Sequence, residues 1–165
     1  PIMLKISPDI NDSTIDEISE IAIDNSITAL ILTNTTNTNR NNLIELQKNE
    51  IGGLSGKPLE DISNNIIKKF YKKLSGKIII IGVGGVDSGK SAYNKIISGA
   101  SLVQLYTGMI FKGPEVVKNI KTQLVNLGKT RAVKGIETRP VKHGKIQVVN
   151  NIKIQPVNVG EVTIV

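Results

Sequence analysis

The feature that most constrains the fold of this chain is a pattern that occurs four times within residues 1–128. Each copy has a short aliphatic segment, a polar loop and an amphipathic segment with helical spacing. The aliphatic segments, which are predicted to be strands, are Ile2–Ile6, Ala29–Thr33, Ile78–Val83 and Ser101–Tyr106. Strands that alternate with helices form parallel sheets through right-handed crossovers. The pattern therefore predicts an α/β fold with four consecutive βα units.

The helix boundaries are predicted from capping residues, prolines and glycines. We expect the four helices to begin after Asp12 or Ser13, at about Leu59, after Asp87 or Ser88, and at Pro114. The last three are expected to end at about Leu74, before Gly99 and at Gly128. The connection from Asn34 to Pro58 is much longer than the usual 2–6 residues of such folds, which is typical of a functional loop.

The composition supports a buried parallel sheet and excludes several kinds of chemistry. Aromatic residues make up 3% of the chain and Trp is absent, so Ile, Val and Leu must fill the core. The absence of Cys excludes disulfides, thiolate metal sites and Cys nucleophiles. The single histidine, His143, argues against a Ser-His-Asp triad and against most zinc sites. The longest apolar run, Ile78–Val83, is far shorter than the roughly 20 residues of a membrane span.

The last part of the chain differs from the repeats in charge and in pattern. Residues 129–165 hold 7 Lys and Arg against 2 Asp and Glu, so most of the net charge of +7 lies there. Lys145–Val149 and Ile152–Gln155 alternate around Asn150-Asn151 as in a β-hairpin, and Glu161–Val165 is a candidate third strand. We therefore expect two regions, residues 1–128 and a basic, β-rich tail at 129–165. No aromatic residue in the tail is available for base stacking, so we predict no nucleic-acid partner.

Two glycine-containing turns follow the third and fourth predicted strands. Ile81-Gly82-Val83-Gly84-Gly85 leads from a strand into a capped helix, and Gln104-Leu105-Tyr106-Thr107-Gly108 ends the next strand. Glycines allow the backbone to approach a phosphate closely, and barrel folds commonly bind phosphate in the loops after their last two strands. We therefore predict a phosphate site at these turns. The alternative is that the glycines only permit tight turns.

The same stretch satisfies the nucleotide-binding pattern G-x-x-x-x-G-K-S between Gly84 and Ser91. A nucleotide hydrolase would also need an aliphatic strand that ends in Asp to hold magnesium. None of the four predicted strands leads into an Asp. The alternative is that Gly89 and Lys90 are exposed residues in the first turn of an ordinary helix.

Polar residues also lie at the ends of the first two predicted strands. Lys5 lies close to the end of the first strand, where barrel folds place functional side chains, although a surface lysine is an equal alternative. Thr33-Asn34-Thr35-Thr36 ends the second strand with donors and acceptors that suit an amide-like or uracil-like ligand, and the alternative is a plain turn. Gly52–Pro58, in the long loop, is a candidate for the same site.

These segments together resemble the class 2, quinone-dependent dihydroorotate dehydrogenases. The segments that carry the resemblance occur in the family's order and at similar spacing: Leu4–Asp9, Leu32–Thr36, Gly52–Pro58, Ile81–Gly85, Gly99–Thr107 and Phe111–Pro114. The resemblance covers residues 1 to about 127 and implies the carboxy-terminal half of a TIM (βα)8 barrel, that is, a parallel (βα) half-barrel of four units. It argues against the nucleotide hydrolase, because Gly89 and Lys90 fall where the family varies.

The resemblance implies roles for eight residues. Lys5, Thr33, Gly56, Gly85, Tyr106 and Thr107 match residues that contact FMN; Lys5 lies beside the flavin ring, and Tyr106 and Thr107 match the phosphate-binding pair. Asn34 and Thr35 match residues that contact dihydroorotate. No residue of this chain matches the family's catalytic base, a Ser in the amino-terminal half of the barrel. The resemblance implies no metal.

The implied activity is the oxidation of dihydroorotate to orotate in pyrimidine biosynthesis, with electrons passed through FMN to a membrane quinone. The implied location is the cytoplasm, peripheral to the inner membrane in the complete enzyme. Because half of the barrel is not matched, we expect the chain to be a piece of a longer enzyme or a degraded gene product that is inactive alone. The alternative function is a non-catalytic FMN- or phosphate-binding remnant. Open strand edges predict a homodimer or pairing with an amino-terminal half.

Overall fold

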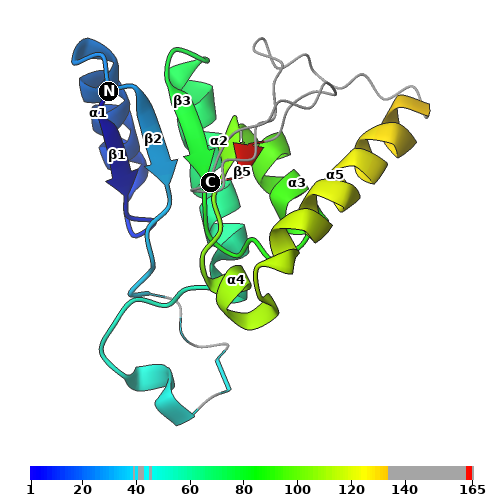
Figure 1. Ribbon diagram of the computed structural model, residues 1–165. Helices are drawn as coiled ribbons and strands as arrows, with labels where there is room; N and C mark the ends of the chain where they lie inside the picture. The colour runs from blue at the N-terminus through cyan, green and yellow to red at the C-terminus, as the bar shows by residue number, and fades with distance from the viewer. Residues whose placement is uncertain (39, 41–42, 45, 134–162, 165) are drawn as a thin grey trace.

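The described part of the chain forms one parallel sheet. The computed structural model describes residues 1–38, 40, 43–44, 46–133 and 163–164 (Figure 1). The strands are β1 (Met3–Ile6), β2 (Ala29–Leu32), β3 (Ile79–Gly82), β4 (Leu102–Val103) and β5 (Thr163–Ile164), and they lie side by side in this order. Every neighbouring pair is parallel. The predicted α/β class and the four βα units are thus confirmed, although each strand is shorter than predicted.

Helices separate the strands along the chain. They are α1 (Asp12–Asp24), α2 (Glu60–Leu74), α3 (Gly89–Ser98), α4 (Thr107–Lys112) and α5 (Glu115–Val133), with 3-10 turns at Leu46–Asn49 and Lys57–Leu59. In Figure 1 the strands β1 to β3 point in one direction, and their carboxyl ends meet the loop after β2 and the chain around α4. The loops at this edge are the ones that carry the predicted site residues.

The strand residues alternate between two faces, because successive side chains of a strand point in opposite directions. Leu4, Leu30 and Ile80 are register partners and pack into a core with Ile67 and Phe70 of α2. A second core joins α3, α5 and β4, and its members include Ala92, Val103 and Ile120. The described hydrophobic cores thus lie between the sheet and its helices.

The opposite face of the sheet is only partly covered. Met3, Ala29 and Ile79 form one row across three strands, and in this row Met3 is 55% exposed and Ile79 is 45% exposed. The prediction of a buried sheet is therefore wrong for Met3 and Ile79 on this face. A closed barrel would bury these side chains in its interior.

The helix ends correct several predictions. Asn11, and not Asp12 or Ser13, caps α1, because its Oδ1 accepts the Thr14 N–H at 2.9 Å. The predicted Ser88 cap of α3 is confirmed. The last helix does not end at Gly128 but continues to Val133. A single glycine inside a helix costs only about 1 kcal/mol, which does not stop a helix flanked by favourable residues. The short helix α4 was not predicted.

The tail is described only at Thr163–Ile164. These two residues form β5, which pairs parallel with β4 through Leu102 and Val103. A strand within Glu161–Val165 is thus present, but it joins the main sheet. The predicted hairpin at Lys145–Gln155 lies outside the described residues. No helix in the described part of the chain has the length and apolar character to cross a membrane.

We predict that the chain self-associates through its open sheet. The edge of β1 and the exposed apolar row of Met3 and Ile79 favour pairing with another chain. Sedimentation should be compared for the full chain and for a version that ends at Val133, where α5 ends. The shortened version should associate at least as strongly, because removal of β5 opens the edge of β4. Stable monomers of both versions would contradict this prediction.

Candidate functional site

A cavity of about 490 Å³ lies at the carboxyl ends of the strands. Its lining comes from five chain segments that are distant in sequence: Lys5, residues 33–35, residues 55–59, residues 83–87, and residues 105–108 with Phe111 and Lys112. All eight predicted site residues are among them. The site residues predicted from the sequence therefore converge on one cavity in the fold.

The turn after β3 is shaped so that only glycine fits. Gly85 has φ +72°, and a Cβ added to it would lie 2.7 Å from Glu60 Cα and 2.8 Å from Glu60 N. Gly84 has φ +109°, and a Cβ added to it would lie 3.0 Å from the Leu59 side chain and 3.2 Å from Ser63 Cβ. The first turn of α2 therefore packs directly against this backbone. The absence of side chains lets the backbone of this turn lie between α2 and the cavity, which both glycines line.

The loop after β2 and the turn after β4 meet at the same place. The Thr107 hydroxyl donates to Ser55 Oγ at 3.1 Å. A Cβ on Gly56, which has φ +78°, would lie 3.1 Å from Thr107 Cγ2. Tyr106 lines the cavity and is mostly exposed. The structure thus brings Gly56 and Thr107, which are 51 residues apart, into close contact beside the Gly85 turn.

Thr33 presents a buried polar atom without a partner. Its side chain is 2% exposed, and its hydroxyl finds no hydrogen bond among the described residues. A buried hydroxyl without a partner is unfavourable by about 1–3 kcal/mol. Because Thr33 lines the cavity, a bound ligand that hydrogen-bonds to it would remove this penalty. Lys5, on the same side of the sheet as Ile31 and Ile81, offers a cation to the same space.

Asn34 and Thr35 lie in the exposed start of the loop after β2. The Asn34 side-chain oxygen accepts the Thr35 N–H at 2.9 Å, which leaves the amide NH₂ directed away from this bond. The loop is fixed further on by Asp9, whose carboxylate accepts hydrogen bonds from the Thr36 hydroxyl, the Asn37 N–H at 2.7 Å and the Thr38 hydroxyl at 3.0 Å. Sequence reasoning gave Asp9 no role, because its partners lie 27 or more residues away.

We predict that Asp9 is needed to hold this loop. Partial burial acts to raise the pKa of the Asp9 carboxyl, but the hydrogen bonds from Thr36, Asn37 and Thr38 outweigh it, so the pKa lies below its usual value. The stabilisation is therefore present above about pH 4 and is lost as pH falls through the lowered pKa. Asp9→Ala should increase hydrogen exchange of the Asn37 amide at neutral pH, whereas Asp24→Ala, at the exposed end of α1, should not. Equal exchange in the two variants would refute the role of Asp9.

The structure does not support a nucleotide-binding function for the motif between Gly84 and Ser91. Ser91 is fully buried, and its hydroxyl accepts the N–H groups of Asp87 at 2.9 Å and Ser88 at 3.0 Å, so it serves as a helix cap. Gly89 is also buried, and its N–H donates to Gln123 Oε1 at 2.7 Å. The expectation that Gly89 is exposed is therefore wrong, because α5 packs against it. Lys90 is exposed, as expected.

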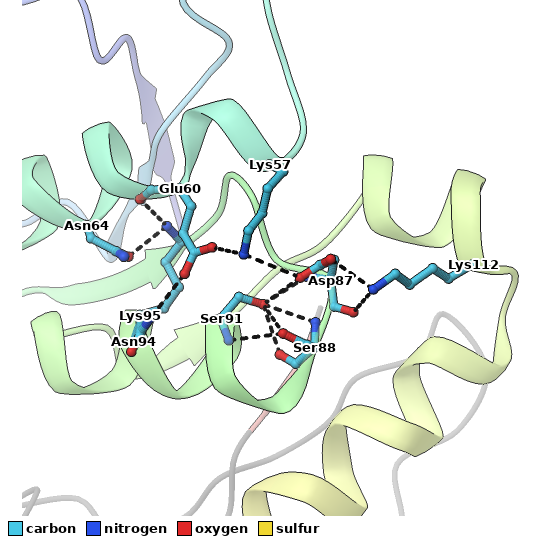
Figure 2. Close-up of polar contacts among 9 residues, drawn as sticks. All are labelled: Lys57, Glu60, Asn64, Asp87, Ser88, Ser91, Asn94, Lys95 and Lys112. Atoms are coloured by element: carbon cyan, nitrogen blue, oxygen red, sulfur yellow. Dashed lines mark hydrogen bonds and ion pairs between the residues drawn. The ribbon is translucent and has the colours of Figure 1, made fainter. Parts of the chain in front are cut away.

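Asp87 joins two lysines at the rim of the cavity, as Figure 2 shows. Lys112 Nζ lies 2.8 Å from Asp87 Oδ2, and Lys57 Nζ lies 3.8 Å from Asp87 Oδ1. Burial acts to raise the pKa of Asp87, but the two cations and a hydrogen bond with Ser88 hold it below its usual value. Asp87 is therefore ionised near neutral pH and is a weak base.

A buried lysine lies behind the cavity. Lys95 of α3 is 0% exposed, and its amine donates to the Glu60 carbonyl at 3.2 Å and to Asn64 Oδ1 at 2.8 Å (Figure 2). Burial lowers the pKa of Lys95 to about 7, against the opposing effect of the Glu60 and Asp61 carboxylates. A neutral amine has two N–H groups, which matches these two acceptors. Sequence reasoning missed Lys95, because lysines in amphipathic helices usually face water.

We predict that Lys95 makes the stability of the chain depend on pH. The amine loses its proton near pH 7 in the folded chain and near pH 10.4 when unfolded, so the unfolded chain binds more protons between these values. The free energy of unfolding should therefore rise from pH 7 to pH 9.5, by at most about 1.4 kcal/mol per pH unit. Urea denaturation measures it. Lys95→Met should abolish the rise, whereas Lys73→Met should keep it; a rise that persists in Lys95→Met would contradict the assignment.

A four-unit parallel α/β sheet with a cavity at the carboxyl ends of its strands has the arrangement of a segment of a (βα) barrel. The family model for dihydroorotate dehydrogenase matches residues 1–127. The chain therefore belongs to the dihydroorotate dehydrogenase family, and its relatives include proteins of the quinone-dependent class. The predicted family resemblance is thereby confirmed.

Similar proteins include the mitochondrial dihydroorotate dehydrogenase (quinone) of Mus musculus, 46% identical over 130 residues that make up 79% of this chain and 33% of the mouse protein. Dihydroorotate dehydrogenase (quinone) of Wigglesworthia glossinidia brevipalpis is 50% identical over 121 residues, 73% of this chain and 36% of that protein. The chain thus spans about a third of the length of these relatives. Among solved structures, DHODH of Eimeria tenella in complex with ferulenol aligns with a TM-score of 0.78 and 36% identity, and covers 85% of this chain and 39% of that one.

Proposed function

We propose that residues 1–133 form the cofactor-phosphate and substrate-contact part of a flavin-dependent dihydroorotate dehydrogenase. The observation that carries this proposal is the convergence of Thr33, Gly56, Gly85 and Thr107 on one cavity at the carboxyl ends of the strands. The family is flavin-dependent, and the binding of FMN by this chain is part of the proposal. Dihydroorotate as substrate and a quinone as electron acceptor are proposed from the names of the relatives.

The residues fit FMN in three respects. The side-chain-free turn at Gly84 and Gly85 admits a phosphate, which the neighbouring Thr107 hydroxyl would contact. The unpartnered Thr33 hydroxyl offers a hydrogen bond to the flavin. Lys5 would place a positive charge beside the ring and stabilise negative charge there. When bound, FMN accepts the two electrons that dihydroorotate loses on conversion to orotate.

Asn34 and Thr35 would hold the substrate. An Asn side chain offers both a donor and an acceptor, which complement the amide groups of dihydroorotate. Asp9 fixes the loop that carries them and so orients them toward the cavity. The described cavity holds no good candidate for proton abstraction, and we propose that this group belongs to the other half of the barrel. Quinones partition into membranes, so we also propose that the complete protein works at a membrane surface.

A second proposal is that the chain is a flavin-binding remnant without activity, and it is favoured by the weakness of Asp87 as a base. Titration of the purified chain with FMN tests the flavin binding that both proposals share. Dye reduction with dihydroorotate after addition of the amino-terminal half of a complete relative separates them, because the chain alone is expected to lack the base: activity of the mixture supports the dehydrogenase segment, and flavin binding without such activity supports the remnant. Binding of ATP in the absence of flavin binding would overturn both of them.

A further inference from the structure

We infer that Lys95 is a positioning residue that sets the geometry of the phosphate turn after β3, although it does not line the cavity. This inference deepens the proposed function, because it concerns how the flavin phosphate would be held. It rests on three sets of contacts in the described structure. Hydrogen bonds from Lys95 join α3 to α2, the start of α2 packs against the turn, and Asn94 and Lys57 hold the Glu60 side chain.

The first contact joins the two helices through Lys95. Its buried amine donates to the backbone carbonyl of Glu60 and to the side-chain oxygen of Asn64, and both acceptors lie at the start of α2 (Figure 2). Asn64 is 8% exposed, so its oxygen depends on this bond. Lys95 therefore fixes the start of α2 relative to α3.

The second contact couples the position of α2 to the backbone of the phosphate turn. The backbone of Glu60 is the surface against which Gly85 packs, with no room for even a methyl group. Ser63, also in the first turns of α2, donates its hydroxyl to the Val83 carbonyl at 2.5 Å. A displacement of this part of α2 must therefore displace the backbone at residues 83–85.

The third contact restrains the Glu60 side chain. Asn94 Nδ2 donates to Glu60 Oε1 at 3.0 Å, and Lys57 Nζ pairs with Oε2. Neighbouring residues of α3, Asn94 and Lys95, thus hold the side chain and the backbone of Glu60. Apolar residues at both position 95 and position 64 would avoid the desolvation of the amine and of its side-chain acceptor, and such paired replacements of buried polar groups are often neutral or stabilising. Stability alone therefore does not explain a lysine here, whereas the positioning of the turn does.

The test measures the conformation of the turn and the affinity for the flavin phosphate separately. The variant is Lys95→Met, and Lys73→Met is the control, because it makes the same substitution at an exposed lysine of α2 that pairs with Asp16 of α1. Without ligand, the amide resonances of Gly84 and Gly85 should shift in Lys95→Met, and that of Gly76 should not. With ligand, the affinity for FMN should fall about tenfold or more. The affinity for riboflavin, which has no phosphate, should stay the same.

A double variant separates positioning from a merely structural role. Lys95→Met leaves the Asn64 oxygen without its partner, and Lys95→Met with Asn64→Leu removes that defect. Stability should recover in the double variant, while FMN affinity stays low. Recovery of FMN affinity, or unchanged Gly84 and Gly85 resonances in Lys95→Met, would overturn the inference. If Lys95→Met does not fold, the resonances of Gly84 and Gly85 and the affinities for FMN and riboflavin are compared between the double variant and the unaltered chain. Equal affinity of the unaltered chain for FMN and riboflavin would instead overturn the proposed function, and the resonances would still decide the role of Lys95.

Discussion

Dihydroorotate oxidation by the 165-residue chain, supplied with FMN and an electron-accepting dye, is expected to stay at the background of the assay. The oxidation requires a base that removes a proton from the substrate. Asp87 is the only carboxylate among the described residues that line the cavity, and two lysines hold its pKa below its usual value. Loss of a general base alone typically lowers a rate by about 10²–10⁴-fold. The open sheet should add a further loss, because the proposed flavin site is enclosed by it on one side only.

The assay needs a complete relative as its reference, and the mouse quinone-dependent enzyme would serve. The expected rate of the chain is lower than that of the reference by about 10⁴-fold or more. Asp87→Asn should leave the background rate unchanged, because Asp87 is not the base. A rate within a hundredfold of the reference would mean that residues of this chain supply the missing chemistry.

The second large effect is expected at Gly85. Gly85→Ala should abolish detectable FMN binding and lower the free energy of unfolding by several kcal/mol, because the added methyl would overlap the backbone of Glu60. Gly76→Ala is the matched control. Gly76 has φ +80°, close to the +72° of Gly85, but its added methyl would meet no atom within 4 Å. The control therefore carries only the backbone strain of about 1 kcal/mol.

Urea denaturation and fluorescence titration with FMN measure the two effects. The difference in stability between the two alanine variants isolates the contact with α2 from the strain of positive φ. Gly85→Asp should likewise show no detectable FMN binding, since its carboxylate also repels a phosphate. An FMN affinity in Gly85→Ala equal to that in Gly76→Ala would show that the turn after β3 does not hold the flavin.

The fold could be predicted from the sequence where local pattern decides it. The strands and the Ser88 cap depend on neighbouring residues, and each was located within a few positions. The pairing of β5 with β4 and the continuation of α5 through Gly128 depend on distant contacts and on a balance of small energies. Local pattern does not contain that information, so the last strand was not assigned to the main sheet and the helix was ended too early.

In the site, too, the residues set by local pattern could be predicted and those set by distant contacts could not. Residues at the ends of the strands, such as Lys5 and Thr107, could be grouped because parallel strands share one functional edge. Asp9 and Lys95 could not, because each acts through partners on other elements. The pattern of α3 gives no sign that Lys95 is buried, since its acceptors come from α2. Positioning residues of this kind become visible only when the packing of helices is known.

The most direct test of the proposed site compares the binding of FMN and riboflavin to the unaltered chain. The turns at Gly85 and Thr107, where we propose that the phosphate binds, line the described cavity. The sheet beside them is open on its β1 edge, so we expect the phosphate to supply most of the affinity. Titration followed by flavin fluorescence and by ³¹P NMR should show tight binding of FMN with a shifted phosphorus resonance, and binding of riboflavin at least a hundredfold weaker. Equal affinities for the two flavins, or an unshifted phosphorus resonance at saturation, would contradict a phosphate site at these turns.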